Sequence, residues 1–416
     1  MLQKFLLPSM ILLPLVLLLL ALLLAAPSAL CFDLHKGTGG LAIYWGQNSL
    51  SLQTDGKEEE LDLQDYCNSS TPPDIILLAF HHVFTENPQI NLSKHCEKYF
   101  KGSQMLDCTS LAPQIQACQE KGIKVLLSMG GATGAYSMVN NDIASSYAQT
   151  VVDTYLSGNS SDVIRPFGDA VLDGVDLDIE GGGDTGYAEF TNKLREIEPD
   201  VLITAAPQCA FPDAMLGDAL DNGWVDAVFI QFYNNFCNAG TSEFNFATWA
   251  DWAQSKSKNP DVKLYIGSPA CQACASTGYL GAEKLEQVYT DIKRSNGDVL
   301  GGIMLWDAGA AYYDDSGATP IAEQLKQTVL ENKTFSGSED ISSGPAQSST
   351  VKTTGYSSLS SSASTPESSS SSSAPLVKRV AEETPRTIVG RDAMPYPDNK
   401  QNVKHPNYLL GNPYGG

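Results

Sequence analysis

The sequence predicts an α/β fold, a single (β/α)8 TIM barrel at residues 32–334, followed at residues 335–416 by a disordered Ser/Thr-rich tail. Two observations predict the barrel. Between residues 38 and 330, apolar β-rich runs alternate with segments of helical periodicity. The alternation repeats eight times, whereas a doubly wound sheet would normally use fewer strands. A third observation predicts the tail, because the composition after Asn332 changes to Ser, Thr, Gly and Pro and cannot build a core.

Eight short runs are the expected strands, and periodic segments between them are the expected helices. The strands cover residues 40–44, 75–80, 124–128, 174–180, 202–205, 227–232, 263–267 and 302–306. The helices include residues 111–121, 142–155, 187–198, 246–258, 283–296 and 320–332. Active sites of such barrels lie at the C-terminal ends of the strands, so residues distant in the sequence are expected to meet there.

Residues 1–31 have the layout of a secretory signal peptide. Lys4 precedes a long Leu-rich run, and small residues follow that run. We expect cleavage after Cys31 and a protein that is secreted, either extracellular or in a cell wall. A retained membrane anchor is the alternative because the apolar run is long, but Pro8 and Pro14 interrupt it.

The tail has the composition of an O-glycosylated stalk, including a run of six serines at residues 368–373. The stalk is expected to associate the protein with a cell wall. Lys378 and Arg379 form a dibasic pair that either marks a processing site or is ordinary surface charge. The end of the sequence lacks a hydrophobic stretch, which argues against a lipid anchor of the GPI type.

The formal net charge of −22 disfavours nucleic acid and anionic membranes as partners. The sequence contains no phosphate-binding loop, no dinucleotide fingerprint and no paired CxxC zinc pattern. We therefore expect no cofactor, no metal and no membrane contact after the leader is removed, and we expect a monomer.

Nine cysteines support the secretory interpretation. Removal of Cys31 with the leader leaves an even number, as suits an oxidising compartment. Cys271 and Cys274 form a CxxC, but a second CxxC and the strand and helix context of a thioredoxin site are both missing. We interpret this pair as a local disulfide.

The chemistry is concentrated in the segment DGVDLDIEGG at residues 173–182. Asp176, Asp178 and Glu180 alternate with aliphatic residues, a pattern that predicts a β-strand with all three acids on one face. Like charges stacked in this way reduce stability, so stability alone would not select them. A calcium loop is the alternative, but its turn glycine would lie within the ligand run, whereas here the glycines follow Glu180. We interpret Glu180 as a catalytic acid at the strand end.

This segment resembles the DxxDxDxE signature of family 18 glycoside hydrolases, and the surrounding chain is similar to the class III chitinases of plants and fungi. The motifs that match in content and order are IYWGQN (43–48), KVLLSMGG (124–131), LITAAPQC (202–209), VFIQFYNN (228–235) and GGIMLW (301–306). The resemblance implies a secreted endochitinase whose substrates are chitin and chitooligosaccharides, polymers of β-1,4-linked N-acetylglucosamine.

Cleavage of a glycosidic bond needs a proton donor and stabilisation of positive charge at the anomeric carbon, and no separate carboxylate nucleophile is evident. The resemblance therefore implies a retaining reaction in which the acetamido group of the substrate attacks. It implies that Glu180 is acid and then base, that Asp178 stabilises the oxazolinium intermediate, that Asp176 tunes Asp178, and that Tyr233 holds the acetamido oxygen. It also implies a set of substrate-binding residues: Tyr44, Phe80, Gly131, Ala205, Gln231 and Trp306.

The resemblance further implies three disulfides, Cys67–Cys118, Cys96–Cys108 and Cys209–Cys237. One departure from the plant sequences is Ala132, where a third glycine often follows SMGG, and this change is expected to affect sugar affinity rather than the chemistry. Asn91 lies in an N-glycosylation sequon near the expected cleft, so it can carry a glycan or contact the substrate but not both.

Two classes of function remain open at this point. The first is a chitinase, and the second is a lectin-like or inhibitory relative that has kept the barrel and lost the chemistry. The intact acids and Tyr233 favour the enzyme. Among enzymes, an endo-β-N-acetylglucosaminidase acting on N-glycans would retain the same acidic signature, but the motifs around Tyr44 and Gln231 favour chitin.

Overall fold

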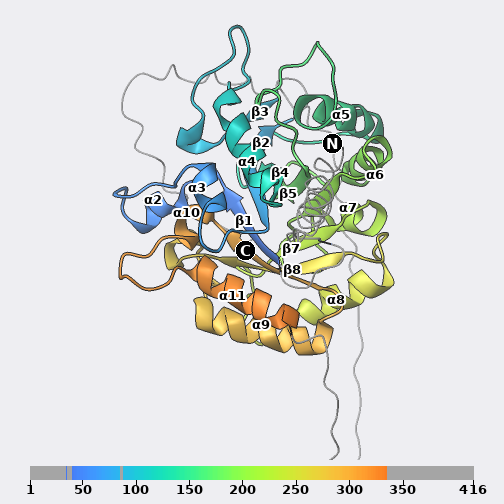
Figure 1. Ribbon diagram of the computed structural model, residues 1–416. Helices are drawn as coiled ribbons and strands as arrows, with labels where there is room; N and C mark the ends of the chain where they lie inside the picture. Colours follow the sequence, from blue (N-terminus) through green and yellow to red (C-terminus); the bar gives the residue numbers. More distant parts are fainter. Residues whose placement is uncertain (1–33, 35–39, 85–87, 335–416) are drawn as a thin grey trace, which may run out of the picture. The chain divides into compact units, whose positions relative to one another are not determined.

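The computed structural model of the chain describes residues 34, 40–84 and 88–334. Eight parallel strands close into a barrel, with β1 paired to both β2 and β9 (Figure 1). The strands are β1 (Gly40–Trp45), β2 (Ile75–Val83), β4 (Lys124–Gly131), β5 (Gly174–Ile179), β6 (Leu202–Ala205), β7 (Ala227–Gln231), β8 (Lys263–Pro269) and β9 (Leu300–Trp306). The predicted (β/α)8 barrel and its eight strands are confirmed.

A short strand that the sequence did not predict, β3 (Gln89–Ile90), pairs antiparallel with the end of β2. The predicted strand at residues 75–80 therefore extends to Val83. The extension is stabilised by His81, whose ring bonds to the carbonyl of Gln89 at 3.0 Å and to the hydroxyl of Tyr147 at 2.5 Å.

Helices surround the barrel (Figure 1). The six that the sequence predicts are confirmed to within three residues at each end: α4 (Ala112–Glu120), α5 (Asn141–Tyr155), α6 (Tyr187–Ile197), α8 (Phe246–Ser255), α9 (Ala282–Asn296) and α11 (Ile321–Thr334). Four short helices were not predicted: α2 (Ser49–Gln53), α3 (Leu63–Cys67), α7 (Gly217–Asn222) and α10 (Ala308–Ala311). Three 3-10 turns, η1 (Ser93–His95), η2 (Thr109–Leu111) and η3 (Gln272–Cys274), complete the described elements. Segments of four to six residues are too short to show helical periodicity.

Alternation along the strands divides the apolar side chains into two cores. Ile43 and Val175 belong to the larger core between the strands and the helices, whereas Tyr44, Phe229 and Met304 belong to a smaller core inside the barrel. The inner core fills the barrel. Polar side chains therefore occupy the lumen only at the strand ends or where these side chains are hydrogen-bonded to one another.

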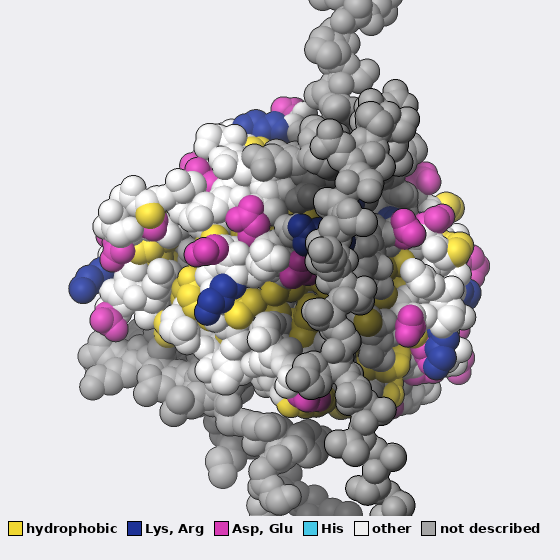
Figure 2. All heavy atoms as spheres, turned by 90° about the horizontal axis from the view of Figure 1, so that it is seen from below, with side chains coloured by type: hydrophobic (Ala, Val, Ile, Leu, Met, Phe, Trp, Pro, Cys, Tyr) yellow, Lys and Arg dark blue, Asp and Glu magenta, His cyan; other side chains and the backbone are white. Residues whose placement is uncertain are grey.

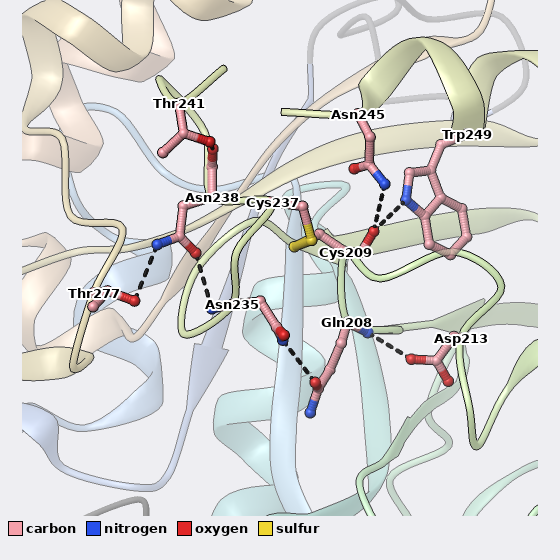
Figure 3. Close-up of a disulfide and its surroundings, with 10 residues drawn as sticks. All are labelled: Gln208, Cys209, Asp213, Asn235, Cys237, Asn238, Thr241, Asn245, Trp249 and Thr277. Carbon is pink, nitrogen blue, oxygen red and sulfur yellow. Dashed lines mark hydrogen bonds between the residues drawn. A yellow bond between two sulfur atoms is a disulfide. The ribbon is translucent and has the colours of Figure 1, made fainter. Parts of the chain in front are cut away.

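Four disulfides form within the described residues: Cys67–Cys118, Cys96–Cys108, Cys209–Cys237 and Cys271–Cys274. All four pairings match the expectations. Cys209–Cys237 joins the loop after β6 to the loop after β7, and the side chains of Asn245 and Trp249 both donate to the carbonyl of Cys209 (Figure 3).

Acidic side chains are scattered over the face seen in Figure 2 rather than gathered in one patch, and basic side chains lie singly among them. Among the described residues, no helix is long and apolar enough to cross a membrane. The expected signal peptide, the Ser/Thr-rich tail and the dibasic pair lie outside the described residues, so they remain predictions.

The long connection between α5 and β5 is held by Arg165. Its guanidinium donates to the backbone carbonyls of Asp153, Leu156, Gly168 and Ala170 at 2.7 to 3.1 Å. A lysine cannot reproduce this fork of donors, because its ammonium is a single point with three protons.

We expect Arg165→Lys to lower the free energy of unfolding by about 1–3 kcal/mol, since it leaves half-buried carbonyls without partners. Urea denaturation measures the change. Arg294→Lys is the matched control, because Arg294 is exposed and forms an i, i+3 surface ion pair with Asp291. Equal losses in the two variants would contradict this role of Arg165.

Candidate active site

Asp176 lies at the centre of a hydrogen-bond network inside the barrel. Its carboxylate accepts bonds from the hydroxyls of Tyr44 at 2.8 Å, Ser128 at 2.8 Å and Thr204 at 2.7 Å. These three donors come from β1, β4 and β6, so the acid connects three strands to its own strand, β5. Burial raises the pKa of Asp176, and the three hydrogen bonds oppose that rise.

Asp178 is the next residue of β5 after Asp176 that faces into the barrel, so it lies closer to the end of the strand. Its side chain is also buried. The amide of Gln231 on β7 donates to its carboxylate at 2.8 Å and also to the carbonyl of Ala206 at 3.0 Å. Burial raises the pKa of Asp178 well above its usual range, and the charges of Glu180 and Asp176 raise it further. The acids therefore titrate as a coupled set rather than as independent groups.

Glu180 follows the last residue of β5 and is partly exposed at the mouth of the barrel. Its backbone N–H donates at 3.1 Å to the hydroxyl of Tyr136, which in turn donates at 2.5 Å to the carbonyl of Gly131. This bridge fixes the end of β5 against the end of β4. Burial raises the pKa of Glu180 to about 7, and the negative charge of Asp213 adds to the rise.

Asp213 is a buried carboxylate that no sequence motif predicted. Its two oxygens accept the backbone N–H groups of Gln208 at 3.0 Å, Met215 at 2.9 Å and Leu216 at 2.7 Å (Figure 3 shows the first of these). Both oxygens are thus occupied by the backbone of its own loop. Asp213 acts on Glu180 as a fixed negative charge.

Tyr233 lies two residues after the end of β7 and is 8% exposed. Burial and the charges of Asp178 and Glu180 raise the pKa of its phenol well above 10. The phenol therefore keeps its proton and can donate a hydrogen bond. A Cβ at Gly278 would lie 2.7 Å from the Cα of Tyr233, so the loop after β8 packs directly against this residue.

Three aromatic rings from β1, β2 and β9 lie together: Tyr44, Phe80 and Trp306. The centroids of Tyr44 and Trp306 are 5.4 Å apart, and the rings of Phe80 and Trp306 stack at 5.8 Å. Tyr44 and Phe80 are buried, whereas Trp306 is partly exposed. Trp306 is therefore the ring of this group that presents a face to solvent.

Gly131 is positioned by its contact with Phe80. Its φ is +89°, and a Cβ there would lie 2.8 Å from the ring of Phe80, so only glycine fits. The neighbouring Ala132 is exposed. Asn91 is also exposed, and its backbone pairs with that of Phe80 in both directions at 2.8 Å. The substrate and glycan roles predicted for these residues remain predictions.

Two residues of the predicted motifs lie away from the acids. Ala205 is fully buried in the core between strands and helices, and its neighbours Thr204 and Ala206 are the residues that face the lumen. Any contact of Ala205 with a sugar is therefore limited to its backbone. Asp173 lies at the opposite end of β5, where it accepts from Val125 N at 2.9 Å and pairs with Lys124 at 3.0 Å, which is a structural role.

The structure thus brings together Tyr44, Asp176, Asp178, Glu180, Gln231 and Tyr233, all of which the sequence predicted for the site. It adds Ser128, Thr204, Tyr136 and Asp213. Ser128 and Thr204 could have been found from strand register, because each pairs with Asp176 across β5. Tyr136 and Asp213 lie in loops, where no periodic pattern exists.

The conserved pattern of Glycosyl hydrolases family 18 matches residues 41–278, more than half of the chain. The chain belongs to this family. Chitinase 2 of Rhizopus oligosporus is 44% identical over 273 residues, which cover 65% of this chain and 49% of that protein. The acidic endochitinase of Phaseolus angularis is 38% identical over 276 residues, covering 65% of this chain and 85% of that protein.

The chain spans about half the length of the fungal relatives that it matches. Among solved structures, the xylanase and alpha-amylase inhibitor protein of Scadoxus multiflorus is similar, with a TM-score of 0.58 and 30% identity over 71% of this chain and 99% of that protein. The structural similarity thus extends to a protein named as an inhibitor, so the function of this chain has to be inferred from the side chains of its own site.

In this family 18 chain, the site combines a carboxylic acid that holds its proton near neutral pH with two buried acids below it. A neutral phenol lies beside them. Such a set can donate a proton, stabilise a neighbouring positive charge and hold an amide. Among the described residues, no three His, Cys, Asp or Glu side chains are grouped to bind a metal ion.

The raised pKa of Glu180 predicts a pH-dependent loss of stability. The pKa in the folded state is about 7, against 4.5 for an unperturbed glutamate. Between these values the folded state binds more protons than the unfolded state, so stability decreases as the pH rises, and the full loss is present above pH 7. We expect Glu180→Gln to be more stable than the wild type by about 1–3 kcal/mol at pH 8 and to show no gain at pH 4.

Denaturation by urea at the two pH values measures this effect. Glu97→Gln is the matched control, because Glu97 is exposed and its replacement removes the same charge. Coincident curves for the wild type and Glu180→Gln at pH 8 would show that the pKa of Glu180 is not raised.

Proposed function

We propose that this protein is a secreted endochitinase that hydrolyses β-1,4-linked N-acetylglucosamine polymers with retention, using the acetamido group of the substrate as nucleophile. One observation supports this above all others. Glu180, at the end of the acidic strand, has a pKa of about 7, and no free carboxylate faces it across the site among the described residues.

A retaining glycosidase with a carboxylate nucleophile needs a second free carboxylate on the other side of the sugar. Asp213 is the acid that comes from a different strand end, but both of its oxygens accept backbone N–H groups of its own loop. Asp176 is likewise occupied by three hydroxyls. Asp178 lies on β5, two residues before Glu180, and so does not face it across a sugar. These positions support a nucleophile that comes from the substrate, and a 2-acetamido oxygen can serve.

In the first step, Glu180 gives its proton to the glycosidic oxygen while the acetamido oxygen attacks the anomeric carbon and the leaving sugar departs. Asp178 accepts the acetamido N–H and stabilises the positive oxazolinium ion that forms. Gln231 holds the Asp178 carboxylate during this step. In the second step, Glu180 removes a proton from water, which attacks the anomeric carbon from the face that the leaving group vacated.

The remaining side chains position the sugar. The phenol of Tyr233 keeps its proton beside the two acids and can donate to the acetamido oxygen. The partly exposed ring of Trp306 can support the apolar face of the sugar whose bond is cleaved, and Phe80 and Tyr44 hold that ring in place. The negative charge of Asp176, deeper in the barrel, raises the pKa of Asp178.

The relatives named as chitinases and an endochitinase support this substrate. The similarity to an inhibitor protein supports the alternative of a binding protein without chemistry. The presence of the complete acid set favours hydrolysis, because carboxyl groups with raised pKa values such as that of Glu180 cluster at catalytic sites. The predicted leader and Ser/Thr-rich tail support secretion and attachment to a cell wall.

The test is product analysis on chitooligosaccharides with the wild type and Glu180→Gln. We expect the wild type to release the β-anomer, which NMR of the fresh products detects. We expect kcat of the variant to be lower by about 10²- to 10⁴-fold, as is typical when a general acid is removed. Glu97→Gln should keep full activity. Binding of the oligomers by the wild type without cleavage would instead indicate a lectin, and cleavage restricted to N-glycans would indicate an endo-β-N-acetylglucosaminidase.

The same assignment predicts the pH profile. Glu180 must be protonated to act as the acid, so kcat/KM on chitooligosaccharides should decrease tenfold per pH unit as the pH rises above about 7. Initial rates between pH 4 and pH 9 measure the profile. A profile that stays flat up to pH 9 would contradict the role of Glu180 as proton donor.

A further inference from the structure

Two aromatic side chains of the described part of the chain are mostly exposed to solvent: Tyr99, at 62%, and Phe236, at 66%. The other exposed large apolar side chains are aliphatic. A single exposed aromatic residue on a surface needs no explanation in general. These two differ from ordinary surface residues in their location and in the rigidity of the loops that hold them.

Both residues lie in loops at the catalytic end of the barrel. Phe236 follows β7 and is three residues beyond Tyr233, and Tyr99 lies in the segment that follows β2 and β3. In the order of the barrel, three strands separate β2 from β7 in each direction: β4, β5 and β6 on one side, and β1, β9 and β8 on the other. The two segments that carry these rings therefore leave the barrel on opposite sides of its mouth.

The loop of Phe236 is fixed by the residues before and after it, Asn235 and Cys237, which Figure 3 shows. Before it, Asn235 donates its side chain to Gln208 at 2.8 Å and its backbone N–H to Asn238 at 3.0 Å. After it, Cys237 is bound to Cys209.

The side chain of Asn238 connects this loop to the next one, because its amide donates to the hydroxyl of Thr277 at 3.0 Å. The backbone N–H of Asn234 donates to the carbonyl of Thr277 at 3.1 Å, and the Asn234 side chain accepts from Ser276 N at 2.7 Å. The same loop packs against Tyr233 at Gly278. Phe236 is thus held rigidly with respect to the catalytic tyrosine while its ring stays exposed.

The loop of Tyr99 is braced in a similar way. Cys96 and Cys108 close it by a disulfide. Within the loop closed by this disulfide, Tyr99 pairs with Leu106 in an antiparallel bridge. The backbone N–H of Phe100 donates to the carbonyl of Met105 at 3.0 Å. A closed hairpin therefore presents the exposed ring of Tyr99.

We propose that Tyr99 and Phe236 are stacking platforms for outer sugar units of a chitin chain that lies across the barrel mouth. Pyranose rings have apolar faces that pack on aromatic rings, and a ring that is already fixed loses little conformational entropy when a sugar binds. The platforms hold uncharged sugars remote from the cleaved bond, so they favour long substrates over short ones. This proposal rests on the proposed chitinase function.

The test measures affinity without cleavage, in the Glu180→Gln background, by calorimetry with chitohexaose and with chitobiose. We expect Tyr99→Ala and Phe236→Ala each to weaken hexaose binding about 5- to 20-fold, and the double variant to combine the two losses. Chitobiose affinity should stay unchanged. Phe236→Trp should restore hexaose binding, whereas Phe236→Leu should not, because the flat ring and not apolarity alone is needed.

Val171→Ala is the control for loss of exposed apolar surface, because Val171 is 44% exposed and precedes β5 at the opposite end of the barrel. It should leave both affinities unchanged. Unchanged hexaose affinity in the Tyr99 and Phe236 variants would overturn the platforms. If wild-type activity on chitohexaose is present in that case, the proposed function stands alone, whereas absence of both binding and cleavage by the wild type would overturn both proposals.

Discussion

The structure depends on placing three carboxylates on one strand inside a closed barrel. Asp176, Asp178 and Glu180 come progressively closer to solvent along β5, and each is accommodated in a different way. Asp176 is held by hydroxyls from three other strands, Asp178 by one amide, and Glu180 by a shift of its pKa. The number of protein donors to each acid decreases along the strand, whereas burial and the charges of neighbouring acids raise the pKa values of Asp178 and Glu180.

The core between strands and helices mainly stabilises the fold, whereas the core inside the barrel also supports the site. The larger core, between strands and helices, is apolar and supplies the stabilisation that the acidic interior removes. Inside the barrel, Tyr44 contributes both to packing and to the polar network of the site. Its ring packs against Trp306, and its hydroxyl donates to Asp176. Loops further fix the end of the barrel that carries Glu180. In one of them, backbone N–H groups of the loop donate to the carboxylate of Asp213.

Much of this arrangement could be predicted from the sequence. The apolar runs fixed the eight strands, and the alternation in β5 placed its acids on one face. Ser128 and Thr204 were missed because their partnership with Asp176 depends on register between strands, which one segment does not reveal. Ala205 shows the same limit, since a shift of one residue in the pleat turns a lumen position into a core position. Tyr136 and Asp213 act from loops, whose shape depends on the finished barrel.

The anchoring of Glu180 has a consequence for how such a protein can evolve. Its position is set by its backbone N–H and the hydroxyl of Tyr136, while the network around Asp176 lies deeper in the barrel. A single codon change at Glu180 therefore leaves the barrel and its rims intact. A protein built in this way can lose its proton donor in one mutational step and still keep a rigid surface on which new recognition is selected.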